Sequence, residues 1–219
     1  MSPSHGAAFR GFRDDKQSPF FCAPGRTPEQ TWDISVDRLG RLLVDLAPVA
    51  KSGPIEMSPG LLCSWHAEIF GELFPRDAGR LRGYRDGQPQ HVYFGVHNRG
   101  YRGTTPRELR RRLEKICAEF NTAAANIRDL GADDTYDAVA VATRLYAKVL
   151  RAHPFVDGNL RGTIVALDAA LLTLKLPRVQ FTDLELHDEL LGIAFVGRND
   201  PYRPLAEHIA DLIRTPEQS

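Results

Sequence analysis

Cysteine is scarce in this sequence of 219 residues, and the three cysteines, Cys22, Cys63 and Cys117, lie far apart. They are odd in number and form no CxxC pair, which argues against a disulfide framework and against a zinc site. Such usage is typical of proteins in a reducing compartment. We therefore expect a cytoplasmic protein, or one that is secreted into a host or rival cell by a route that the sequence does not reveal.

A net charge is also missing. Lys and Arg together number 28, as do Asp and Glu, so the formal net charge is zero. This balance removes any global electrostatic reason to expect direct binding of nucleic acid or of an anionic membrane. No stretch approaches the roughly 20 apolar residues that span a bilayer, and residues 1–20 have no apolar core of the signal-peptide type. We expect neither a membrane nor a nucleic acid as partner.

Helical periodicity runs through most of the chain. Apolar residues recur at helical spacing over residues 33–47, 61–74, 136–152, 163–176, 184–196 and 204–213. A further helix is expected from Thr105, where Pro106 suits the first helical position and Glu108 completes a capping box. These patterns predict a mainly α fold, a helical bundle. Residues 1–50 are interpreted as a partly flexible N-terminal extension, and 51–219 as the main domain.

One segment favours β-structure within this helical pattern. His91, Val92, Tyr93 and Phe94 are β-prone and lie in a stretch rich in glycine and proline. Residues 98–100 can turn the chain into a second strand. The sequence therefore predicts a short β-hairpin added to the bundle.

The connection between two expected buried helices has an unusual composition. Residues 153–161 read His-Pro-Phe-Val-Asp-Gly-Asn-Leu-Arg. The Asp-Gly-Asn run is turn chemistry, and the next helix begins directly after it, so the free N–H groups of that helix face the loop. A helix N-terminus binds anions, more strongly if Gly158 and Asn159 curl their amides into a nest. Arg161 opposes the helix dipole unless an anion lies opposite it.

Two further side chains of this loop point to phosphate chemistry. His153 can act as a general base near neutral pH, because the unperturbed pKa of histidine is about 6.5. Asp157 offers a hard oxygen ligand for Mg²⁺, which binds one or two carboxylates together with phosphate oxygens. The combination is typical of phosphoryl or nucleotidyl transfer. The alternative is that the histidine only caps a helix and that the rest is an ordinary turn.

The same nine residues resemble the signature of the Fic (Fic/Doc) family, HPFx[D/E]GNGRxxR. Trp65–Pro75 and Ala78–Arg82 are similar to the family's upstream helix and its FPWAGxxR element, and Asn199–Leu205 is similar to its closing N-x-x-Y-x-P-L segment. The resemblance covers residues 60–213. It implies the Fic fold, a helical bundle with a short β-hairpin flap. It also implies AMPylation, the transfer of AMP from ATP to a Ser, Thr or Tyr hydroxyl of a target protein, by a bacterial toxin or effector.

The resemblance assigns roles to the matched residues. His153 would deprotonate the target hydroxyl, Asp157 would bind Mg²⁺, and the flap residues His91, Val92, Tyr93 and Phe94 would hold the target by strand addition. The Asn159 side chain would assist the loop amides in holding phosphate. The residues expected to bind the nucleotide are Gly158, Asn159, Leu160, Arg161, Asn199 and Tyr202.

Two positions depart from the family pattern. Leu160 stands where the family has glycine, and leucine resists the positive φ angles that glycine allows. Ile164 stands where the family has an arginine that resembles a clamp on the γ-phosphate. Either departure is compatible with a different donor, in which UMP, a phosphate or phosphocholine is transferred. Both are also compatible with a catalytically weak Fic-like protein that binds nucleotide.

Regulation and target docking leave alternatives open. The family's inhibitory helix reads [ST]xxxE[GN], and its nearest match, Ser64–Glu68, fails because Ile69 follows. Restraint would then come from a separate antitoxin or regulatory chain. His66 is expected to have a packing role. A cationic stretch is a solvated helix face, a docking site for an acidic target, or a substitute for the missing clamp: Arg99, Arg102, Arg107, Arg110, Arg111, Arg112 and Lys115.

Overall fold

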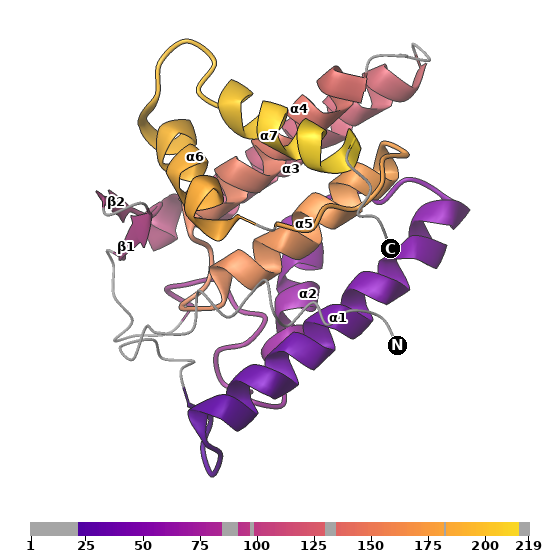
Figure 1. Ribbon diagram of the computed structural model, residues 1–219. Coiled ribbons are helices and arrows are strands. Elements are labelled where there is room, and N and C mark those ends of the chain that lie inside the picture. The colour runs from indigo at the N-terminus through magenta and orange to yellow at the C-terminus, as the bar shows by residue number, and fades with distance from the viewer. Residues whose placement is uncertain (1–21, 85–91, 97–98, 130–134, 182, 215–219) are drawn as a thin grey trace.

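The computed structural model describes residues 22–84, 92–96, 99–129, 135–181 and 183–214, which form seven helices and one two-stranded sheet (Figure 1). The predicted mainly α fold class is confirmed. No helix in these ranges is long and apolar enough to cross a membrane. The elements are α1 (Pro28–Ser52), α2 (Pro59–Phe70), β1 (Tyr93–Val96), β2 (Arg99–Arg102), α3 (Pro106–Asp129), α4 (Thr135–Ala152), α5 (Asn159–Thr173), α6 (Leu184–Val196) and α7 (Arg203–Arg214).

Side-chain caps begin several of these helices where the sequence changes from turn residues to helix formers. Thr27 and Gln30 form a capping box at the start of α1. The Ser58 hydroxyl accepts a hydrogen bond from the Leu61 amide at the start of α2 (3.1 Å), and Asp183 caps α6 in the same manner. Each cap satisfies an amide that the helix itself leaves without an acceptor.

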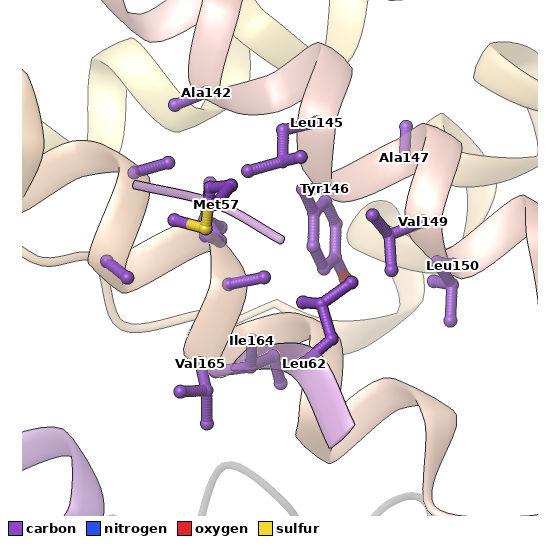
Figure 2. Close-up of a cluster of buried hydrophobic side chains, with 14 of the residues drawn as sticks. Met57, Leu62, Ala142, Leu145, Tyr146, Ala147, Val149, Leu150, Ile164 and Val165 are labelled. Atoms are coloured by element: carbon purple, nitrogen blue, oxygen red, sulfur yellow. The ribbon is translucent and has the colours of Figure 1, made fainter. Parts of the chain in front are cut away.

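Helix α5 runs through the middle of the molecule, with α1 and α2 on one side and α4 on another (Figure 1). Almost all of its side chains are buried, as expected for a helix that is apolar around most of its circumference. Figure 2 shows part of this core, where Ile164 and Val165 of α5 lie among side chains that include Leu62 of α2 and Tyr146 of α4. The position of α5 in the core gives its N-terminus a rigid support.

Helix α1 belongs to the same core. Its residues Leu39, Leu43 and Leu46 are buried, and the helix packs against α2 and α5. Much of the expected N-terminal extension is therefore a packed helix, which contains the helix predicted over 33–47. Residues 1–21 lie outside the described residues, and the domain boundary near residue 51 stays a prediction.

The predicted β-hairpin is confirmed. Strands β1 and β2 pair antiparallel, with Tyr93 opposite Arg102 and Val96 opposite Arg99. The Tyr101 hydroxyl donates to the carbonyl of Gly192 in α6 (3.3 Å), so the hairpin is attached to the bundle. His91 lies outside the described residues, and of the other expected flap residues Val92 directly precedes β1.

Candidate active site

His153 lies at the end of α4 in a strained conformation. Its amide donates to the carbonyls of Val149 (3.2 Å) and Leu150 (3.0 Å), yet its φ angle is +52°, in the left-handed region. Residues other than glycine adopt this region at an energetic cost, and such strain is concentrated at functional sites. The backbone therefore turns sharply at the residue expected to act as the base.

The buried side chain of Arg82 holds this turn in place. Its Nε donates to the carbonyl of His153 (2.6 Å), and its guanidinium also donates to the carbonyl of Thr104 (2.7 Å). The Arg82 backbone amide donates to the carbonyl of Pro154 (2.9 Å). Because Thr104 lies two residues after the end of β2, one arginine connects the His153 turn to the exit of the flap.

The imidazole of His153 is covered by the hairpin. The Phe94 ring stacks on it, with centroids 4.3 Å apart and planes 13° from parallel. Burial, and secondly the Arg82 charge, lower the pKa of His153 to about 3. Its Nδ1 atom is buried without a hydrogen-bond partner among the described residues. The ring is thus neutral at pH 7, and a neutral imidazole has one nitrogen whose lone pair can accept a proton.

The loop after His153 is closed by its own side chains. The Asn159 carboxamide accepts a hydrogen bond from the Phe155 amide (2.8 Å) and donates to the Phe155 carbonyl (3.0 Å). We expected this side chain to assist in holding phosphate, and that role stays a prediction. The Asn159 side chain is buried and stabilises the loop through these two hydrogen bonds.

His66 supports the loop through hydrogen bonds. The sequence indicated only a packing role for this residue. Its Nδ1 accepts from the amide of Gly79 (3.0 Å), so the proton is on Nε2, which donates to the carbonyl of Asp157 (2.8 Å). The ring stacks on Phe155 at 3.9 Å. Burial lowers the pKa of His66 to about 4, which keeps this scaffold neutral.

Gly158 is the N-cap of α5 and has a φ angle of +69°. A Cβ atom there would lie 2.4 Å from Cε2 of Phe70, so only glycine fits. The first backbone bond of α5 runs from the Gly162 amide to the Gly158 carbonyl (3.0 Å). The amides of Asn159, Leu160 and Arg161 precede that bond. This N-terminus is the kind of site that binds a phosphate.

Asp157 and Arg161 place opposite charges at this N-terminus. The Asp157 carboxylate accepts from the Gly158 amide (2.5 Å). The Arg161 guanidinium donates to the Ser35 hydroxyl and lies over the rings of Phe70 (4.7 Å) and Trp32 (5.2 Å). Burial lowers the pKa of Arg161 to about 10, so the group stays charged at pH 7. Its charge adds to the positive end of the α5 dipole.

The family model described as "Fic/DOC family" matches residues 56–171, which is more than half of the chain and includes the His153 loop. The chain belongs to the Fic/DOC family. Solved structures of Fic proteins have the same fold. A Fic-domain signaling protein from Bacteroides thetaiotaomicron has a TM-score of 0.62 at 16% identity, over 87% of this chain and 68% of that one. No curated protein matches this Fic chain in sequence.

Two further Fic structures are similar to this chain. Fic-1 from C. elegans has a TM-score of 0.60 at 24% identity, over 87% of this chain but only 52% of that one. BepC, a VirB-translocated effector from Bartonella tribocorum solved with bound AMPPNP, has a TM-score of 0.61 at 16% identity, over 83% of this chain and 87% of that one. This chain therefore spans about half the length of the solved segment of the C. elegans protein, and these likenesses show the fold alone.

The Fic loop offers one carboxylate to a metal ion. Among the residues that the structure describes, no group of three or more His, Cys, Asp or Glu side chains is arranged to hold a metal. A Mg²⁺ ion at Asp157 would therefore take its remaining ligands from phosphate oxygens and water, as Mg²⁺ commonly does. The donor set fits Mg²⁺ bound together with a nucleotide, and the assignment of Asp157 stays a prediction.

The other residues singled out from the sequence differ in location and in exposure. Asn199 is exposed in the connection between α6 and α7, with a φ angle of +56°. Tyr202 lines a groove beside the hairpin exit, with Thr104 and Ala152. Leu160 is half-buried, and Ile164 is 8% exposed within the core (Figure 2). At the position of the family's clamp arginine, this chain thus has a core residue.

Proposed function

We propose that this chain is a protein adenylyltransferase that transfers AMP from ATP to a Ser, Thr or Tyr hydroxyl of a target protein. One observation carries the proposal: a neutral His153 in a strained conformation lies on the short loop that leads into the N-terminus of the buried helix α5, where Arg161 adds a positive charge. A base beside an anion site is the minimum needed to activate a hydroxyl next to a phosphate.

The chemistry follows from this arrangement. His153 takes the proton of the target hydroxyl, whose oxygen attacks the α-phosphorus of ATP. A new P–O bond forms, the bond to the bridging oxygen breaks, and pyrophosphate leaves. The amides that begin α5, together with the Arg161 charge, stabilise the negative charge of the phosphates. Asp157 would hold Mg²⁺, which neutralises phosphate charge when bound.

The hairpin is suited to hold the acceptor. Tyr93 is 71% exposed, whereas the next residue, Phe94, faces His153. A target segment that pairs with this hairpin would lie along the wall of the site, within reach of the imidazole. The target protein would then be recognised first through backbone hydrogen bonds with the hairpin. The register of this strand pairing would determine which hydroxyl lies next to His153.

A relative supports the choice of donor and the biological class. BepC was solved with AMPPNP, an ATP analogue, and it is a translocated effector. We extend both properties to this chain as part of the proposal, so that it would act as a bacterial toxin or effector on a target protein.

A second candidate is a Fic-like protein that uses another donor or turns over poorly. Ile164 is buried, and the Arg161 guanidinium is held by Ser35 and by two aromatic rings. Neither residue is placed as a clamp on a γ-phosphate. This favours a donor that is not held by its terminal phosphate, or nucleotide binding without rapid transfer.

Intact-mass spectrometry of self-modification separates the two candidates. The full chain is incubated with Mg²⁺ and with ATP, UTP or other phosphoryl donors, beside an Asp157→Ala variant. A mass increase of one AMP with ATP, absent in the variant, supports the adenylyltransferase. An adduct with another donor supports the second candidate. So does calorimetric binding of ATP without any adduct.

A further inference from the structure

A groove of about 980 Å³ opens beside the exit of the hairpin. It is lined by the end of β2 and the residues after it and by α3, α4 and α6, and its lining includes the apolar residues Ala147, Ala194 and Phe195. We call it the basic groove, because six of its lining side chains are cationic: Arg102, Arg111, Arg112, Lys115, Lys148 and Arg151. Glu108 is the acidic residue among the described lining, and its carboxylate accepts from the Thr105 hydroxyl (2.8 Å).

Two cations of the basic groove share one carboxylate. Glu119 pairs with Lys148 (2.6 Å) and lies 3.9 Å from Lys115. Within the described ranges, Arg111 and Arg112 have no carboxylate within ion-pair distance. Burial, together with the neighbouring Arg112 charge, lowers the pKa of Arg151. The positive charges gathered in the basic groove repel one another. An anion bound between them would reduce this repulsion.

The lining of the basic groove includes residues that adjoin the active site along the chain. Gly103 and Thr104 of its wall directly follow β2, and Ala152 of its wall directly precedes His153. The Gly103 amide donates to the carbonyl of Val92 (2.9 Å), so the hairpin ends where the groove begins. A polypeptide that pairs with the hairpin and continues past its exit would enter the groove.

We propose that the basic groove binds an acidic segment of the target protein, next to the segment that carries the modified hydroxyl. The proposal rests on the proposed function and names the chemistry of its target. The groove is far larger than one phosphate ion, and its cations are distributed over the hairpin, α3 and α4. A nucleic acid is disfavoured because the formal net charge of the chain is zero.

The test is direct binding of a short fluorescent peptide of alternating Glu and Ala, measured by anisotropy with the full chain. In the groove variant, Arg111→Glu is combined with Arg112→Glu. In the matched control, Arg107→Glu is combined with Arg110→Glu, which changes the charge equally on the same helix outside the groove lining. All four side chains are exposed, so both proteins should fold. We expect affinity to fall about tenfold or more in the groove variant and about threefold or less in the control.

Four results would overturn the proposal: equal loss in both variants, no binding to the wild-type chain, displacement of the peptide by ATP or inorganic phosphate at comparable concentration, or equal affinity for a short oligothymidylate. The assay needs no group transfer. A chain that binds the peptide but modifies nothing therefore refutes the proposed function alone. A chain that transfers AMP but does not bind the peptide refutes only the proposal that the groove binds an acidic segment.

Discussion

The His153 loop and the basic groove meet at Ala152, yet they are built on opposite principles. In the loop, Asn159, His66 and Arg82 satisfy backbone groups of the loop with hydrogen bonds of 2.6–3.0 Å. In the groove, exposed and half-buried cations gather, and two of them, Lys115 and Lys148, share the Glu119 carboxylate. A loop that positions reacting atoms must be rigid before the substrate arrives. A surface that recognises a partner can leave its charges to be neutralised on binding.

His153→Ala should have the largest effect on the rate of transfer. It changes the His153 loop and leaves the basic groove unchanged. Loss of a general base typically lowers the transfer rate by about 100- to 10,000-fold. The rate of adduct formation by intact mass gives the comparison, and calorimetry with ATP checks that nucleotide binding is retained. His208→Ala, on α7, is the control histidine. If the His153 variant keeps more than about a tenth of the wild-type rate, another group is the base.

Restoring the family pattern with Leu160→Gly and Ile164→Arg should destabilise the protein. Ile164 is 8% exposed and lies in the core shown in Figure 2, where an unpaired guanidinium would cost several kcal/mol, on the order of 3 or more. Ile164→Val, at about 0.5–1.5 kcal/mol, is the matched control. Thermal unfolding beside the transfer rate decides the question. Unchanged stability with faster AMP transfer would show that an arginine there reaches the phosphates.

Gly158→Ala tests the rigidity of the loop. The φ angle of +69° costs an alanine about 1–3 kcal/mol, and the added Cβ would meet the Phe70 ring. We expect a lower melting temperature together with loss of nucleotide binding. Gly40→Ala in α1, where a Cβ meets nothing within 4 Å, should be neutral or stabilise by about 0.5–1 kcal/mol. Equal behaviour of the two variants would mean that the loop adapts easily.

Phe94→Ala should have the smallest effect, a change in the pH dependence of transfer. With its pKa near 3, His153 stays deprotonated from neutral pH down to about pH 4, so the wild-type rate should not fall between pH 8 and 5. Without the stacked ring, solvent reaches the imidazole and its pKa moves toward about 6.5. The rate of the variant should then fall as the pH drops below about 6.5.

Tyr93→Ala, on the exposed side of the same strand, is the control for this pH profile. Superimposable profiles of the Phe94 variant and the wild type would show that the hairpin ring does not set the pKa of His153. Together with the groove variants, this experiment separates the two proposed roles of the hairpin, which are to cover His153 and to lead the target into the basic groove.

The elements of the fold and the residues of the loop were predictable because their signals are local. Caps such as Ser58, helical periodicity, and the β-prone residues at 92–94 act over a few neighbouring positions. Gly158 and Asp157 lie in a contiguous motif, so their turn could be read without knowing the rest of the chain. The same reasoning correctly placed α5 at the centre of the core.

The tertiary structure alone decided which partners those residues have. Arg161 donates a hydrogen bond to Ser35 of α1, and His66 of α2 donates one to the Asp157 carbonyl. The ring of Phe94 in the hairpin stacks on His153. The basic groove likewise draws its cations from three elements. The sequence by itself determined the helices, the hairpin and the motif, because these depend on backbone preference and short-range spacing. Hydrogen bonds and ring stacks between distant segments depend on how the helices pack, which no local pattern encodes.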